Sequence, residues 1–388
     1  MYALFAIGGS LYQGAIPILA TEVFSFTLFQ AGLLLTLTGV IYILTDGPIG
    51  VLVDLIGCRN GALLGLGCAA TTALLALSSQ SLAVFLIGVI FFALSWNIMS
   101  ISSAAYILRT GGKEVSGRLF GIQGSLFVFG NVIGAFGVGH VSAGGIAYSG
   151  LVFLLTSLAA GAFVLFFLHP NEIATRSASL KWFQWRPGIQ AMRDFAPVSW
   201  VSALNGFVNY TFGSAIWLII PLSLARLSNN LFPEGTALGI FQFSGIVTIF
   251  AGGYLADHHS RKKLFLILLL IETVGVLCLG IVNNNILIFL ILALLATSAL
   301  DAAQPVLSSM LSDVNKGKNN EGALEGFTGM LSDFGFLVGP LVGGVLFETF
   351  GLNSAFIFLG ILMILNWLAS HWLLRKFDSR ILTAAVYT

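Results

Sequence analysis

Long apolar runs separated by short polar stretches dominate the pattern of this chain. A helix that crosses a bilayer needs about 20 mostly apolar residues, and twelve such segments can be placed. Their predicted ranges are 2–20, 31–53, 61–79, 82–108, 117–140, 147–168, 196–224, 236–256, 264–282, 286–312, 323–348 and 354–374. A membrane β-barrel would alternate polar and apolar residues, whereas the run from Leu264 to Ile271 is apolar at consecutive positions. Because backbone groups in lipid must be satisfied within their own segment, the pattern predicts an all-α polytopic membrane protein.

The composition agrees with lipid as the solvent. Hydrophobic residues make up 57% of the chain and charged residues only 9%, whereas about a quarter of a soluble chain is charged. The 45 glycines suit helices that approach one another closely in a membrane. A net charge of +1 gives no indication of nucleic-acid binding. The three cysteines have neither metal-ligand nor CxxC spacing, so we expect them to pack as small apolar residues.

The positive charges predict the orientation of the chain. Of the 17 Lys and Arg, only Arg226 lies outside the connections after even-numbered spans and the C-terminal tail. Under the positive-inside rule both termini are therefore expected in the cytoplasm. The first apolar segment has no basic leader, so we expect a retained span and no cleaved signal peptide.

The chain divides into two halves around a polar middle segment. We expect an N-terminal six-helix bundle at 1–168, a cytoplasmic loop at 169–195, a C-terminal six-helix bundle at 196–374 and a tail at 375–388. The loop contains Trp182, Phe183, Trp185 and Arg186, which predict a short interfacial helix that anchors the loop at the headgroups.

One short polar motif occurs once in each half, between two apolar segments. Its first copy contains Gly50, Asp54, Gly57 and Arg59, and its second contains Gly253, Asp257 and Arg261. A glycine at the end of a membrane helix lets a second helix pack closely. The aspartate and the basic residues then lie at the water interface, where they can pair with each other or with a helix end.

Other markers repeat at nearly the same offset. Asp257 follows Asp54 by 203 positions (257 − 54), and Gly335 in the eleventh span follows Gly130 in the fifth by 205 (335 − 130). Such a parallel repeat of two six-helix halves predicts a pseudo-twofold axis along the membrane normal.

The two motif copies resemble the loop motif of the major facilitator superfamily, written roughly G-x-L-a-D-r-x-G-r-k. The resemblance implies two six-helix bundles that form a secondary transporter working by alternating access. It also implies that the loops around Asp54 and Asp257 stabilise the state closed to the cytoplasm. The run from Gly335 to Leu346 is similar to a motif of family antiporters, but close helix packing explains it equally well. The fourth span lacks the intramembrane arginine of many proton-coupled antiporters, because Arg109 lies at its cytoplasmic end.

By the same resemblance, the first helix of each triplet lines a central cavity. Polar residues in these spans are costly in lipid and so indicate a water-filled path. The candidates for the substrate cavity are Tyr12, Gln13, Asn97, Asn205, Asn209, Tyr210, Asp301 and Gln304. For the asparagines, hydrogen bonding between helices without any ligand remains an equal alternative.

Two carboxyl groups deep in the spans are candidates for proton coupling. Asp301 and Asp333 lie well inside the tenth and eleventh segments, where a low dielectric favours the protonated form of a carboxyl. The alternative is a carboxylate paired for structural reasons. Asp46 lies one turn before Gly50, and the pattern gives no account of Glu272 in the ninth segment.

These observations favour a transporter without cofactor or metal over an enzyme, since the chain has no phosphate-binding loop and no metal-ligand spacing. We expect proton-linked export of a small organic molecule by a monomer in the lipid bilayer. An uptake symporter or a facilitator is the near alternative. A membrane sensor or scaffold with a transporter-like fold is the alternative from a different class.

Overall fold

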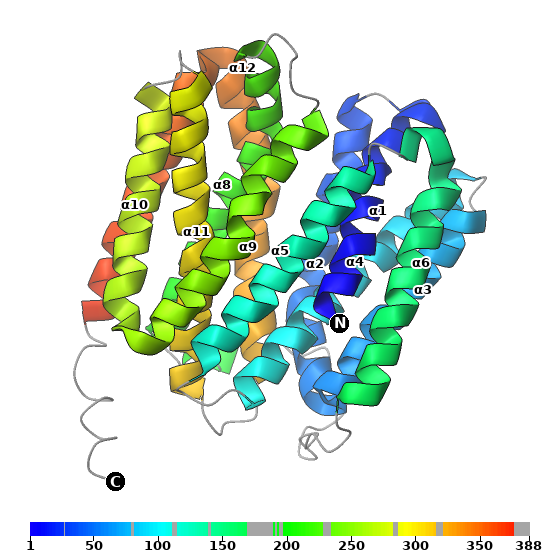
Figure 1. The fold of residues 1–388 in the computed structure, drawn as a ribbon, viewed down its shortest axis with the longest axis horizontal. Coiled ribbons are helices and arrows are strands. Elements are labelled where there is room, and N and C mark those ends of the chain that lie inside the picture. The colour runs from blue at the N-terminus through cyan, green and yellow to red at the C-terminus, as the bar shows by residue number, and fades with distance from the viewer. Residues whose placement is uncertain are drawn as a thin grey trace.

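The computed structural model describes residues 1–26, 28–78, 81–110, 115–138, 141–168, 189–190, 192–193, 197–227, 234–281, 286–315 and 321–375. Throughout these ranges the regular elements are helices (Figure 1). They are α1 (Tyr2–Glu22), α2 (Leu28–Ile56), α3 (Cys58–Ser78), α4 (Leu82–Thr110), α5 (Ser116–Val138), α6 (Val141–Phe167), α8 (Val198–Leu227), α9 (Glu234–His258), α10 (Arg261–Ile281), α11 (Ile286–Asn315) and α12 (Glu321–Arg375). The interfacial helix predicted around Trp182, Phe183, Trp185 and Arg186 lies outside the described residues.

The element α12 consists of two helices. Gly351 has a φ of 81° and a ψ of 177°, which interrupts the helical backbone between a first part (321–350) and a second part. With this break, the described ranges contain the twelve long helices that the apolar runs predict. Most helices extend past the predicted spans, as α2 does at both ends, because a helix continues beyond the hydrocarbon layer into the headgroup region.

Eight segments of the described residues are long and apolar enough to cross a membrane, among them Leu82–Thr110 and Arg261–Ile281. Large apolar side chains also cover the outside of the molecule, and Leu155, Leu158 and Phe166 on α6 are all exposed. Such a surface suits contact with lipid tails.

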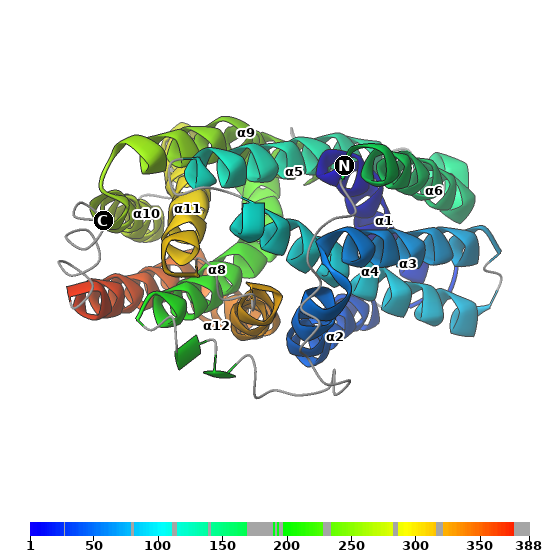
Figure 2. The same ribbon diagram turned by 90° about the horizontal axis from the view of Figure 1, so that it is seen from below.

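The helices form two bundles that lie side by side. Helices α1 to α6 make one half and α8 to α12 the other (Figure 1). Seen from below in Figure 2, α5 and α9 lie together on one side of the junction, and α2 and α12 lie together on the other. These two helix pairs join the halves, and the two-bundle fold predicted from the repeat is confirmed.

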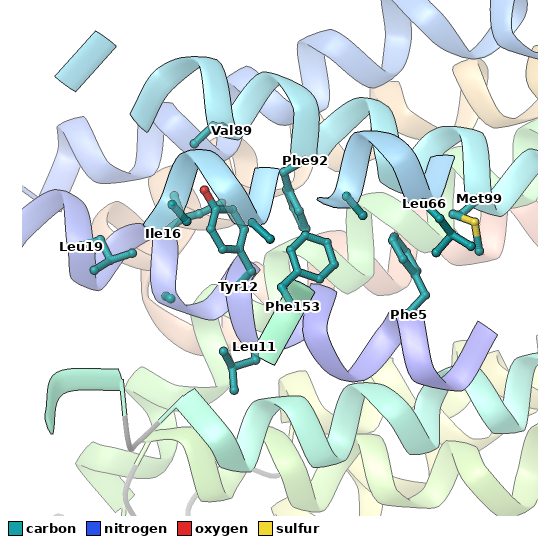
Figure 3. Packing of buried hydrophobic residues seen from close by; sticks show 14 of the residues in the cluster. Phe5, Leu11, Tyr12, Ile16, Leu19, Leu66, Val89, Phe92, Met99 and Phe153 are labelled. Carbon is teal, nitrogen blue, oxygen red and sulfur yellow. The ribbon is translucent and has the colours of Figure 1, made fainter. Parts of the chain in front are cut away.

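Each half has its own core. In the first half, the ring of Tyr12 lies 5.3 Å from that of Phe92 and 5.7 Å from that of Phe153, between centroids (Figure 3). In the second half, Phe289 on α11 packs against Phe356 on α12 with centroids 5.9 Å apart. Separate cores allow each bundle to move as one body relative to the other.

The repeated glycines pack helices within each half. A Cβ at Gly130 on α5 would meet the carbonyl oxygen of Ala3 on α1, and a Cβ at Gly335 on α12 would meet that of Phe207 on α8. The same spacing thus brings α5 onto α1 and α12 onto α8. The contacts of Gly335 support the packing interpretation of the antiporter-like run.

Candidate functional site

The two motif copies lie at the same end of the molecule, which we call the motif end. Asp257, at the end of α9, binds the first turn of α5 in the other half. Its Oδ1 accepts a hydrogen bond from the backbone N–H of Gly117 and its Oδ2 accepts one from that of Arg118, both at 2.9 Å. The Arg118 side chain adds an ion pair at 3.3 Å. The start of a helix suits a carboxylate, because its first N–H groups lack partners and its dipole attracts negative charge.

Arg261 holds Asp257 in place from within its own half. The guanidinium lies 3.2 Å from Asp257 Oδ1 and 2.8 Å from Asp313 Oδ1 on α11. It also donates to the carbonyl oxygen of Ser309 at 2.9 Å. The motif arginine therefore orients the aspartate that joins the halves.

Asp54 forms the corresponding contact from the first half. Its Oδ2 accepts a hydrogen bond from the backbone N–H of Ala323, in the first turn of α12, at 2.8 Å. Its Oδ1 lies 2.6 Å from the guanidinium of Arg109 at the end of α4. Each aspartate thus caps a helix of the opposite half and is oriented by an arginine of its own half.

The two motif copies differ in the arginine that orients the aspartate: Arg261 of the second copy lies within the motif, whereas Arg109 lies outside it. Arg59 donates to the carbonyl oxygen of Leu165 near the end of α6 at 3.3 Å, so of the two expected partners it binds a helix end and not the motif aspartate. Gly57 has a φ of 85° and forms the turn from α2 to α3, a backbone conformation that suits glycine.

The motif glycines lie where the two halves approach most closely. A Cβ at Gly253 on α9 would meet the carbonyl oxygen of Gly117 and lie 2.8 Å from the Cα of Gly121. On the other side of the junction, a Cβ at Gly326 on α12 would lie 3.2 Å from the Cα of Gly50 on α2. Both contacts are with backbone atoms, which cannot move aside as a flexible side chain can.

Further from the motif end, two carboxyl groups meet across the junction. Asp46 on α2 and Asp333 on α12 are both buried and share a hydrogen bond. Asp46 lies ten residues from the end of α2, about 15 Å along the helix. The pair therefore lies at membrane depth, between the halves.

Tyrosines and a third carboxyl surround this pair. Tyr42 on α2 and Tyr210 on α8 both interact electrostatically with Asp46 and Asp333. Glu325, two turns before Asp333, interacts with Tyr2 on α1. We call Asp46, Asp333, Glu325, Tyr2, Tyr42 and Tyr210 the central acidic cluster.

The two helix pairs at the junction have matching glycines but different neighbours. A Cβ at Gly124 on α5 would lie 2.6 Å from Cγ2 of Ile249 on α9. At the repeat-related position 205 residues later, a Cβ at Gly329 on α12 would lie 2.9 Å from Oδ2 of Asp46 on α2. An isoleucine on one side of the junction thus corresponds to a carboxyl on the other.

The same contrast extends along α5 and α12. At the offset of 205, Asp333 corresponds to Val128 and Glu325 corresponds to Phe120. The α5–α9 junction is therefore apolar where the α2–α12 junction carries three carboxyl groups.

Some of the predicted cavity residues keep part of their surface exposed. Tyr210 retains 43% of its surface exposed although it interacts with carboxyl groups of both α2 and α12. Gln13, Asp301 and Gln304 are half-buried. A Cβ at Gly245 on α9 would lie 2.6 Å from Oδ2 of Asp301, which places this carboxyl beside the α5–α9 junction.

Other predicted cavity residues are buried, and the cavity prediction is wrong for Tyr12 and Asn205, which lie inside their own halves. Tyr12 is fully buried in the aromatic core of the first half (Figure 3). Asn205 is also fully buried, and its Oδ1 accepts a hydrogen bond from Asn366 on α12 at 3.0 Å. Asn97 donates to Thr45 Oγ1 on α2 at 3.0 Å, as the interhelical alternative predicts. Asn209 is buried, and neither its Oδ1 nor its Nδ2 has a partner among the described residues.

Several residues of the site were missed. Arg109 was placed at the end of its helix without a partner, and Asp46 was noted only by its distance from Gly50. Tyr2, Tyr42 and Glu325 belong to no sequence motif. The signal that could have identified them is that polar side chains are rare in apolar runs.

A pair of tyrosine variants compares a residue of the core with a residue of the predicted cavity. Tyr12→Phe is expected to leave transport and thermal stability unchanged, because the Tyr12 hydroxyl has no partner among the described residues. Tyr210→Phe is expected to lower transport several-fold, because the hydroxyl of Tyr210 belongs to the central acidic cluster. Initial transport rates of the two purified variants, which lose the same single oxygen, give the comparison. Equal rates would contradict the placement of the cavity.

Comparisons with known proteins agree with this geometry. The sequence profile of the Major Facilitator Superfamily matches residues 1–224 and again residues 202–382. A curated relative, the Multidrug resistance protein MdtG of Dickeya zeae, is 30% identical over 200 residues. That match spans 48% of this chain and 47% of the relative, so the chain covers about half of the relative's length.

Solved transporters share the fold over nearly the whole chain. The human organic anion transporter MFSD10 superposes with a TM-score of 0.80 at 17% identity, over 95% of this chain and 96% of that one. The E. coli fucose:proton symporter FucP superposes with a TM-score of 0.77 at 17% identity, over 96% of each chain. At such identities the likeness concerns the fold alone. The family match over essentially the whole chain, together with the two aspartate caps and the two-bundle fold, places this protein in the Major Facilitator Superfamily, as a membrane transporter and not an enzyme.

Proposed function

We propose that this transporter exports small organic molecules in exchange for protons by alternating access. The observation that carries the proposal is the Asp46–Asp333 pair, buried between the halves at membrane depth. Two carboxyl groups can share a hydrogen bond only when at least one of them holds a proton. When both are ionised they repel each other, because like charges in a low dielectric interact strongly.

Protonation of this pair would therefore act on the contact between the halves. A shared proton holds α2 against α12, and loss of the proton pushes these helices apart. The α5–α9 junction has Ile249 and Val128 at the corresponding positions, so the repulsion between two ionised carboxyls has no counterpart there. One side of the junction would then act as the hinge while the other side opens.

The aspartate caps support an assignment of the conformation. Under the positive-inside rule the motif end and both termini lie in the cytoplasm. Asp54 and Asp257 join the halves at that end, which corresponds to the state closed to the cytoplasm. The FucP structure in the outward conformation has the same fold, with a TM-score of 0.76.

Export and the class of substrate are supported by one relative and by the residues of the proposed cavity. The relative MdtG is named a multidrug resistance protein, and Tyr210 together with half-buried Gln13 and Gln304 would give the proposed cavity aromatic and polar walls. We expect one chain in the lipid bilayer to suffice, with bundles at 1–168 and 196–374, since the halves together contain both caps and the acidic cluster.

Transport by purified protein in liposomes tests the proposal. The vesicles would carry a pH gradient, and fluorescent dyes of positive, negative and zero charge would serve as probes. Accumulation that follows the gradient and collapses with a protonophore is the expected result. Flux that follows only the dye gradient would indicate a facilitator, and cotransport of dye and protons in one direction would indicate a symporter. Dye binding without movement would favour the sensor or scaffold.

A further inference from the structure

A fourth buried carboxyl lies away from the junction, inside the second half. Glu272 is in the middle of α10 and only 1% exposed, and neither of its oxygens has a hydrogen-bond partner among the described residues. Its neighbours along the helix, Leu269 and Val276, belong to the two apolar clusters of this half. The central acidic cluster does not include it.

Asp301 on α11 is the charged group that interacts electrostatically with Glu272. Asp301 is half-buried beside Gly245 on α9, next to the junction. No ion pair of the described residues involves either carboxyl. One carboxyl thus lies half-buried next to the junction, and the other is buried inside the second half.

The surroundings of Glu272 cannot hold a free charge. An ionised carboxylate without hydrogen bonds or a counter-ion costs several kcal/mol or more in a low dielectric, and an ionised Asp301 would add repulsion. A glutamate in such a place therefore carries a proton or a bound cation. The electrostatic partner that the structure provides is another acid, and Asp301 is the less buried of the two carboxyls.

We infer that Glu272 is a proton-binding site that fills and empties through Asp301. When Asp301 is ionised, the proton is retained on Glu272. When the halves rearrange and Asp301 becomes more exposed to water, a proton passes from Glu272 to Asp301 and from there to water. This site is separate from the Asp46–Asp333 pair and lies within one half.

Infrared difference spectroscopy of the purified protein tests the site without any transport. Glu272→Gln preserves the shape of the side chain but cannot lose a proton, and Asp301→Asn removes the exchange partner. The difference between wild type and Glu272→Gln is expected to contain one protonated-carboxyl C=O band that responds to pH and shifts in D2O. In Asp301→Asn this D2O shift is expected to be at least tenfold slower.

Three outcomes would overturn the inference. The first is a difference spectrum without a protonated-carboxyl band. The second is a band that responds neither to pH nor to D2O, which would indicate a closed structural carboxyl. The third is a band that disappears at constant pH when K⁺ is replaced by Na⁺, which would indicate a cation site. The D2O shift of the wild-type band provides a measurement on native protein, in case a variant does not fold.

The transport consequence rests on the proposed proton coupling. If both sites release a proton in each cycle, Glu272→Gln lowers the accumulation ratio at a gradient of one pH unit by about tenfold, since each coupled proton contributes a factor of ten. If Glu272→Gln leaves the accumulation ratio unchanged while the Glu272 band titrates in wild-type protein, Glu272 has no part in proton coupling. If transport by wild-type protein does not depend on the pH gradient but the Glu272 band titrates, the proposed function is wrong and Glu272 is still a proton-binding site.

Discussion

Asp333→Asn is expected to abolish accumulation driven by a pH gradient while substrate exchange continues. The amide mimics a protonated carboxyl and still donates a hydrogen bond to Asp46, so the α2–α12 contact stays closed as if the proton never left. Net export requires that proton to be released, whereas exchange of substrate for substrate does not. We expect gradient-driven transport to fall by more than about 100-fold, because the neutral side chain removes the repulsion between two ionised carboxyls, worth several kcal/mol. Paired measurements of accumulation and exchange in the same vesicles give the result.

Asp46→Asn serves as the second variant, since it neutralises the same pair from the other half. Like Asp333→Asn, it should abolish gradient-driven accumulation while substrate exchange continues. Ile249→Val, at the repeat-related position on the apolar side, should affect neither activity by more than about twofold. Gradient-driven accumulation at the wild-type level in both asparagine variants would refute coupling through this pair.

Gly253→Ala is expected to prevent closure at the motif end. The added methyl group would meet the carbonyl oxygen of Gly117 and the Cα of Gly121, so α9 must move away from α5. Overpacking against backbone costs about 1–3 kcal/mol, which shifts a two-state equilibrium about 5- to 150-fold. Spin labels at Thr110 on α4 and Lys263 on α10, both exposed, would report the distance between the halves once the native cysteines are replaced. A longer distance and a loss of transport are the expected results.

Gly67→Ala provides the matched control for this substitution. It introduces the same methyl group on α3, where a Cβ would have no atom within 4 Å. The control should keep the wild-type distance and rate. A Gly253→Ala protein with the wild-type distance would show that the halves close without the tight contact of α5 and α9.

The sequence predicted the features of this fold that depend on local pattern. Apolar runs identify helices because lipid leaves the backbone no other partner, and the spacing of Asp54 and Asp257 identifies the repeat. The side of each helix that faces the cavity was harder to predict. Tyr12 was assigned to the cavity and lies in the core, because a helix that is apolar all round carries no stripe that marks its inner face.

Contacts between the halves could be predicted only in part. The sequence predicted that the motif aspartates bind a basic residue or a helix end. It could not identify the helix end that Asp54 binds, at Ala323, because that residue is 269 positions away. The pairing of Asp46 with Asp333 depends in the same way on how two distant helices are placed. Asp333 was selected because a carboxyl at membrane depth is rare, whereas Asp46 lay close enough to a predicted interface to pass as solvated.

The aspartate caps have a consequence for how this protein can diverge. Their donors at Gly117, Arg118 and Ala323 are main-chain amides, which every amino acid except proline supplies. The exposed residue 118 can therefore vary in homologues while its backbone contact with Asp257 persists. Alignments of homologues would then show stronger selection on Asp257 than on the residue at position 118 that donates to it.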